Sequence, residues 1–134
     1  MTPEEIALVA ASAERVGPAL REVSADFYTR LFAVHPEVRG MFPADNTGQE
    51  VKFAASIEAI VLAMPDFVAF ADRTAQLGRL HAAHRVTAGQ YSAVGAVLLD
   101  VLAAHDGAWD DPTRDAWATA YDLLAESMQL AARG

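Results

Sequence analysis

His81 and His84 are the residues of this sequence whose type and spacing could bind a metal. They lie in the segment LGRLHAAHRVTAGQY, Leu77 to Tyr91, one helical turn apart at the end of an apolar stripe. Residues at this spacing share one face of a helix, so both imidazoles could serve one site. A lone histidine on an apolar face is, however, more often a hydrogen-bonded core residue than a ligand. The residues alone leave three interpretations open: a core pair, a pair of ligands, or one ligand and one bystander.

A two-metal carboxylate site is disfavoured by the spacing of the acidic residues. Di-iron bundles combine inward glutamates with Glu-x-x-His pairs, and Glu22, Glu58 and Glu126 have no histidine at that spacing. The other two histidines, His35 and His105, lie at expected helix ends, where we expect them to face solvent. Glycine-rich phosphate and dinucleotide motifs and the Gly-x-Ser-x-Gly nucleophile motif are absent from the sequence. Histidine, buried phenols, amides and aromatic rings remain as the candidate chemistry.

Composition and charge exclude several classes of function. The 134 residues are 53% hydrophobic and 21% charged, which is typical of one globular domain spanning residues 1–134. A formal net charge of -8 argues against binding to nucleic acid or to an anionic membrane surface. Because cysteine is absent, disulfides, thiolate metal sites and haem attachment through cysteine are excluded. The start, MTPEEIALVA, is typical of a capped helix rather than a signal peptide, and the longest apolar run, Ala59 to Met64, is too short to cross a membrane. We therefore expect a cytoplasmic protein.

Helical periodicity runs along the whole chain and must position any site. Apolar residues recur at spacings of three and four, without the alternation typical of strands. Capping residues, prolines and the corner PADNTG set the expected boundaries. The pattern predicts an all-α domain of about six long helices plus a short one. We expect these helices at Pro3 to about Val16, Pro18 to about Val34, Pro36 to near Phe42 (the short one), Gly48 to Ala63, from near Asp66 through His81, Ala88 to about His105, and Asp111 to roughly Ala132.

Three segments resemble the bacterial globins of the flavohaemoglobin and single-domain type. DFYTRLFAVHPEVRGMFP is similar to their second helix and the following corner. LGRLHAAHRVTAGQY is similar to the segment that carries their haem-binding histidine, and WATAYDLLAESM to their last helix. The resemblance covers essentially the whole chain in order, and it is closer to single-domain bacterial haemoglobins than to truncated globins. It implies a globin fold, with the helices packed around a haem pocket.

The resemblance implies that His81 is the proximal ligand of the haem iron. In the family this ligand stands ten positions before a buried tyrosine that opens the next helix, which here is Tyr91. His84 then falls on a variable site. A neutral imidazole ligates iron through one nitrogen, and the other needs an acceptor that fixes the ring. We expect that acceptor to be a carbonyl of the preceding turn, near Leu77 or Gly78.

The resemblance also implies that Tyr28, Gln49 and Phe53 close the opposite, distal face of the haem. Tyr28 resembles the distal tyrosine that donates to bound dioxygen, and Gln49, one turn before Phe53, could aim its amide at the same ligand. From the residues alone, Tyr28 could equally be a core tyrosine and Gln49 a solvated first-turn residue. Further expected haem contacts are Phe42, Lys52 (beside a propionate), Ile57, Leu77, Leu80, Val86, Tyr91 and Val94.

The implied function is that of a b-type haem protein that reversibly binds dioxygen, or carbon monoxide and nitric oxide, for transport, storage or sensing. The alternative is an enzyme, a nitric-oxide dioxygenase or nitrite reductase that works with a separate reductase. A globin-like module without haem is disfavoured by the set of His81, Phe42, Tyr28 and Gln49. The glutamate that flavohaemoglobins place late in the last helix falls here on Ala132, so we expect weaker peroxidase-like activation. The physiological role, the resting ferric ligand (water, Tyr28 or Gln49), the redox partner and the oligomeric state stay open at this stage.

Overall fold

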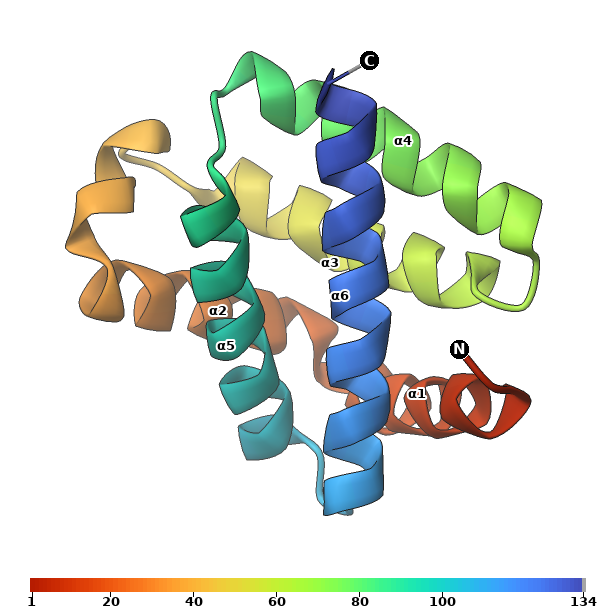
Figure 1. The fold of residues 1–134 in the computed structure, drawn as a ribbon. Coiled ribbons are helices and arrows are strands. Elements are labelled where there is room, and N and C mark those ends of the chain that lie inside the picture. The colour runs from red at the N-terminus through yellow and green to blue at the C-terminus, as the bar shows by residue number, and fades with distance from the viewer. Residues whose placement is uncertain (134) are drawn as a thin grey trace.

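Helices make up most of residues 1–133, the part of the chain that the computed structural model describes (Figure 1). This part contains no strand, which confirms the predicted all-α class. Its six α-helices and two short 3₁₀-helices are α1 Pro3–Val16, η1 Gly17–Ala19, α2 Leu20–Val34, η2 Pro36–Met41, α3 Thr47–Ala63, α4 Phe67–Ala83, α5 Ala88–His105 and α6 Asp111–Arg133. None of the described helices is both long and apolar enough to span a bilayer.

Side-chain caps fix several helix starts where the sequence predicts them. The Thr2 hydroxyl accepts from the Glu5 backbone N–H at 3.1 Å, and the Glu5 carboxylate accepts from the Thr2 N–H at 2.9 Å. Thr87 and Gln90 form the same reciprocal pair at the start of α5. One expected boundary was wrong, because residues from Gly17 to Ala19 form a separate 3₁₀ turn and α2 begins at Leu20 instead of Pro18. The last helix begins at Asp111 as expected, and the Asp110 side chain accepts from the Thr113 N–H at 2.9 Å in its first turn.

The long α6 helix connects most of the fold. It packs along α4 and also contacts α1 and α5, and Figure 1 shows it crossing both α1 and α4. On the other side, α2 packs against α3 and α5, and α3 also contacts α4. The helix that carries Gln49 therefore lies between the helix that carries Tyr28 and the helix that carries His81.

The apolar interior is divided into two clusters. The main cluster contains most of the fully buried side chains, among them Val9, Phe27, Leu102 and Trp117. The second cluster is smaller. Its buried members are Tyr91, Ala125 and Met128, and its partly buried members are Leu77, Val86, Tyr121 and Leu124. Tyr121 contacts both clusters and joins them.

A buried carboxylate closes the end of the main cluster. Asp106 accepts from the Ser12 hydroxyl at 2.6 Å, from Arg15 Nε at 2.5 Å and from Arg15 Nη2 at 2.9 Å. It also accepts from the Ala108 backbone N–H at 2.9 Å. The Arg15 guanidinium, together with the Ser12 and Ala108 donors, lowers the pKa of Asp106 to about 2. This carboxylate therefore ties the start of the chain to the turn between α5 and α6.

Two glycines allow close approach of helices to α6. A Cβ atom on Gly78 would lie 2.7 Å from the Cα of Met128 and closer still to its carbonyl oxygen. A Cβ atom on Gly95 would lie 2.6 Å from Cε2 of Tyr121. Glycine at position 78 thus lets the backbones of α4 and α6 touch, only three residues before His81.

Candidate functional site

His81 lies in the last turn of α4 with a half-buried side chain. Its Nδ1 atom is 2.8 Å from the backbone carbonyl oxygen of Leu77, which is the acceptor that the sequence predicts. Since a carbonyl oxygen only accepts, Nδ1 is the donor in this contact, and in the neutral imidazole the lone pair then lies on Nε2. The Tyr91 ring lies beside the imidazole, with ring centroids 6.2 Å apart and planes tilted by 33°. The geometry holds the ring in the tautomer that ligates a metal through Nε2.

The turn after His81 separates it from the second histidine. The His81 carbonyl accepts from the backbone N–H groups of His84 at 3.0 Å and Val86 at 3.4 Å, which ends α4. Arg85 makes the turn with a φ of 57°, a left-handed conformation that is unusual for a residue other than glycine. His84 itself is exposed at the helix end. The two imidazoles therefore have different surroundings, and only that of His81 is oriented by a neighbour and partly buried.

Tyr28 lies on α2 inside a group of phenylalanine rings. Its own ring is 5% exposed. Burial raises the pKa of Tyr28 to about 12, and the side chain of Gln49 acts on the same hydroxyl and opposes part of this increase. The hydroxyl therefore keeps its proton at neutral pH and stays a donor. The surrounding centroids are those of Phe27 at 5.0 Å, Phe42 at 5.4 Å, Phe53 at 5.5 Å and Phe32 at 5.9 Å.

A hydrogen bond between helices places Gln49 next to Tyr28. The buried Ser24 hydroxyl on α2 donates to the carbonyl oxygen of Glu50 in the first turn of α3 at 2.6 Å. Ser24 is one helical turn before Tyr28, and Glu50 is the residue after Gln49. Gln49 is half-buried. The first turn of α3, which carries Gln49, is therefore held against the part of α2 that carries Tyr28.

The other residues expected to contact haem are distributed over both clusters. Phe42, Phe53, Ile57 and Val94 are partly buried against the main cluster, while Leu77 and Val86 are partly buried against the second. Tyr91 is a buried member of the second cluster, and burial raises the pKa of its hydroxyl. Lys52 and Leu80 lie on the surface, and Leu80 leaves 63% of its side chain exposed.

These residues fit an apolar prosthetic group with a central metal. Half-buried aliphatic and aromatic side chains come from η2's end, α3, α4 and α5, and an oriented imidazole is among them. No group of three or more histidine, cysteine, aspartate or glutamate side chains in residues 1–133 could hold a metal ion directly. A single histidine suits an iron whose other in-plane ligands come from a porphyrin. The donor set therefore matches haem.

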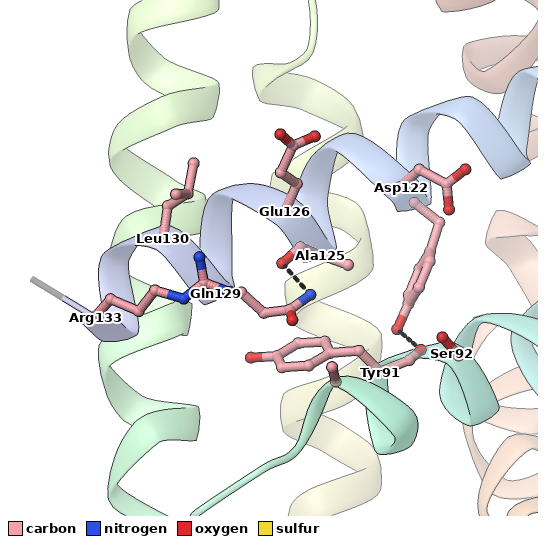
Figure 2. A pocket seen from close by; sticks show the side chains of 10 residues that line it. Tyr91, Ser92, Asp122, Ala125, Glu126, Gln129, Leu130 and Arg133 are labelled. Carbon is pink, nitrogen blue, oxygen red and sulfur yellow. Dashed lines mark hydrogen bonds between the residues drawn. The ribbon is translucent and has the colours of Figure 1, made fainter.

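Tyr91 also borders a pocket that we did not predict from the sequence. A pocket of about 440 Å³ lies between the start of α5 and the end of α6 (Figure 2). In Figure 2 the Gln129 side chain lies next to the Tyr91 ring, and its amide donates to the Ala125 carbonyl at 3.1 Å. Ala132, where the family resemblance placed a missing glutamate, is exposed. The wall that α6 gives to this pocket could have been predicted from the helical spacing of four polar residues. These residues line the pocket together, and they are Asp122, Glu126, Gln129 and Arg133.

Comparison with known proteins identifies the family. The globin family model matches residues 25–128 of this chain. The chain is 32% identical over 132 residues to a flavohemoprotein from Deinococcus radiodurans, and 32% identical over 134 residues to one from Bordetella pertussis. These alignments cover 96% and 94% of this chain but only 33% and 32% of the relatives. The chain thus spans about a third of the length of these curated relatives.

Solved structures show the same fold at lower identity. A bacterial globin from Campylobacter jejuni superposes with a TM-score of 0.87 at 21% identity, covering 98% of this chain and 96% of that one. The hemoglobin of the botfly Gasterophilus intestinalis superposes with a TM-score of 0.88 at 15% identity over the whole of both chains. The globin fold that the sequence predicts is confirmed. The chain belongs to the globin family, which in general supports the binding of a gas through haem.

Proposed function

We propose that this protein binds b-type haem through His81 and uses it to bind dioxygen reversibly, for transport, storage or sensing. The observation that carries the proposal is the 2.8 Å hydrogen bond between Nδ1 of His81 and the Leu77 carbonyl. It fixes the tautomer and orientation of the ring and leaves Nε2 free to ligate. When bound, haem supplies a ferrous iron that takes a diatomic gas.

Tyr28 and Gln49 supply the selectivity for dioxygen in this proposal. Dioxygen gains negative charge as it binds, whereas carbon monoxide gains little, so a phenol and an amide donor favour dioxygen. A good donor to a charged acceptor contributes about 1.5–3 kcal/mol, which slows release roughly tenfold to a hundredfold. The high pKa of Tyr28, which follows from its burial, keeps the donor protonated.

The remaining residues shape the pocket. Phe42 would pack against the bound group, and Phe53 and Ile57 would narrow the space beside the gas. Leu77, Val86, Tyr91 and Val94 supply apolar contacts. The exposed Lys52 and Leu80 would contact the outer edge of the group, with the lysine ammonium near a propionate. Burial of Leu80 on haem binding would remove a large exposed apolar surface from water, which is favourable.

The first test replaces each histidine in turn. We expect His81→Ala to abolish stable haem retention, seen as loss of the Soret band in the purified protein. His84→Ala is the matched control, because His84 is exposed one turn away, and it should keep the band. Far-ultraviolet circular dichroism checks that both variants stay helical. Retention of haem and of gas affinity in His81→Ala would refute the proposal.

The second test addresses the distal donors. Tyr28→Phe should raise the dioxygen dissociation rate at least several-fold in stopped-flow measurements, because the hydroxyl donor is removed. The carbon monoxide dissociation rate should change much less. An unchanged dioxygen rate would remove Tyr28 from the mechanism.

A second candidate function is nitric-oxide dioxygenation or nitrite reduction with electrons from a separate reductase. The similarity to proteins named flavohemoprotein favours it, because that name pairs a flavin with haem. Turnover of nitric oxide by the purified protein with an added flavin reductase would support it. Stable, reversible oxygenation without such turnover would favour the carrier role.

A further inference from the structure

The side chain of Arg39 binds three consecutive carbonyl groups. Arg39 lies in η2, and its Nη1 donates to the Phe42 carbonyl at 3.3 Å and to the Pro43 carbonyl at 3.0 Å. Its Nη2 donates to the Ala44 carbonyl at 3.0 Å. In return, the Phe42 backbone N–H donates to the Arg39 carbonyl at 3.2 Å. One guanidinium therefore holds the whole first part of the connection between η2 and α3.

This connection, residues 42–46 and here called the corner segment, has few other hydrogen bonds. It contains no helix. Within residues 1–133, no backbone N–H outside the helices donates to the carbonyl oxygens of Phe42, Pro43 or Ala44. The planar guanidinium presents several donors in a fixed arrangement, which a lysine ammonium cannot reproduce. The path of the corner segment therefore depends on Arg39.

The same guanidinium stacks on an aromatic ring of the candidate site. Its Cζ atom lies 4.7 Å from the centroid of the Phe32 ring. The Phe32 ring lies 5.4 Å from Phe42 and 5.9 Å from Tyr28, and Phe42 lies 5.4 Å from Tyr28. Arg39 thus donates to the backbone carbonyl of Phe42 and stacks on the ring of Phe32. The rings of both residues contact Tyr28.

The corner segment also leads directly into α3. Its Asp45 side chain accepts from the Thr47 backbone N–H at 3.1 Å, at the first residue of α3. Gln49 lies two residues further on, in the first turn. A change in the path of the corner segment would therefore move both Phe42 and the start of the helix that carries Gln49.

We propose that Arg39 is a positioning residue for the distal face of the gas-binding site. In this proposal it acts through the residues that it binds and not by contact with the gas. It fixes Phe42 and the corner segment, and through them it fixes the relation of Gln49 to the Tyr28 hydroxyl. This inference rests on the proposed function, because it assigns Arg39 to the retention of dioxygen.

The test compares holoprotein variants that differ in the donors at position 39. Arg39→Met keeps the apolar stem and removes every donor. We expect its dioxygen dissociation rate to rise roughly three- to tenfold, the change expected for losing or misaligning one hydrogen bond. The carbon monoxide dissociation rate should stay within about twofold, since that ligand depends little on donors. Arg39→Lys should lie between wild type and Arg39→Met, because one ammonium can serve only part of the carbonyl set.

Arg21→Met is the matched control, because Arg21 is exposed on α2. It should leave both dissociation rates unchanged. If Arg39→Met does not fold, Arg39→Lys alone carries the test. A wild-type dioxygen rate in the Arg39 variants would overturn the proposal, even if they unfold at a lower temperature, because that result shows a purely structural role.

Hydrogen exchange in the haem-free protein separates this inference from the proposed function. Amides of residues 44–50 should exchange several-fold faster in Arg39→Met than in wild type, while those of α5 should not change. Unchanged exchange would show that Arg39 does not hold the corner segment and would overturn the inference. If wild type takes up no haem at all, the proposed function fails, and the exchange result still reports on the corner segment.

Discussion

The main cluster and the second cluster are built differently. The main cluster draws fully buried side chains from α1, α2, α5 and α6, and the Asp106 carboxylate closes one end of it. The second cluster has three buried side chains, which come from α5 and α6. From α4 it receives only the partly buried Leu77. The helix that carries His81 thus contributes no fully buried apolar side chain to either cluster, whereas the helix that carries Tyr28 contributes Val23, Phe27, Tyr28 and Leu31.

This difference indicates how the fold can accommodate a large apolar group such as haem. The residues that we propose as haem contacts belong partly to one cluster and partly to the other, and many are only half-buried. A group bound between them would cover apolar surface on both sides, which is favourable at roughly 25 cal/mol per Å². We expect the His81 side of the molecule to open more readily than the main cluster when that group is absent.

We expect the largest loss of stability from a substitution at the contact between α4 and α6. Gly78→Ala would bring a methyl group into collision with backbone atoms of Met128. Backbone atoms cannot move aside as the end of a flexible side chain could. We expect a loss of about 3 kcal/mol in the free energy of unfolding, measured by urea denaturation. Gly89→Ala is the control, since its Cβ atom would meet nothing nearer than 3.9 Å. Equal stability of the two variants would show that α4 does not rest on α6 through this glycine.

We expect the next largest loss of stability from a substitution of the buried carboxylate in the main cluster. Asp106→Asn should cost about 2 kcal/mol at pH 7, because the pKa of Asp106 is lowered from 3.8 to about 2 in the folded protein. A carboxylate with a lowered pKa stabilises the fold above its unfolded pKa, and this contribution is lost as the pH falls through the folded value. The difference between variant and wild type should therefore shrink between pH 4 and pH 2. Urea unfolding at several pH values measures it, and a constant difference would contradict the assignment.

A smaller effect is expected where the two clusters meet. The Tyr121 hydroxyl donates to the Tyr91 carbonyl at 2.5 Å. Tyr121→Phe removes this bond and keeps the ring against Gly95, so the loss should be about 1 kcal/mol. Hydrogen exchange should quicken in the first turns of α5 and leave α2 unchanged. An equal increase in both helices would show that the clusters behave as one unit.

The smallest effect should come from an ion pair on the surface of α2. Arg30 Nε lies 3.1 Å from Asp26, and the two side chains are 41% and 30% exposed. Arg30→Met should change the free energy of unfolding by no more than about 0.5 kcal/mol. The contrast with Asp106→Asn would sharpen the comparison, because it separates buried from exposed charge. A loss as large as that of Asp106→Asn would show that the main cluster depends on its surface charges as well.

The sequence by itself determined the helices and the surroundings of His81. Caps such as Thr2 with Glu5, the spacing of apolar residues and the prolines act within a few positions of the chain, so their outcome can be predicted without the fold. The same holds for the bond from His81 to Leu77, which spans one helical turn. The proximity of Tyr28 and Gln49 was predictable only through the resemblance to bacterial globins, since two different helices carry them.

Only the tertiary structure decided which distant residues meet. Ser12 and Asp106 are separated by 94 positions, and nothing local in either segment indicates that they share a buried hydrogen bond. The approach of Gly78 to Met128 and the pocket beside Tyr91 likewise depend on how α4, α5 and α6 cross. Periodicity specifies which face of a helix is buried, but it does not specify the partner helix or the register of their contact. Those are set when all the helices pack together, and that packing completes the candidate site.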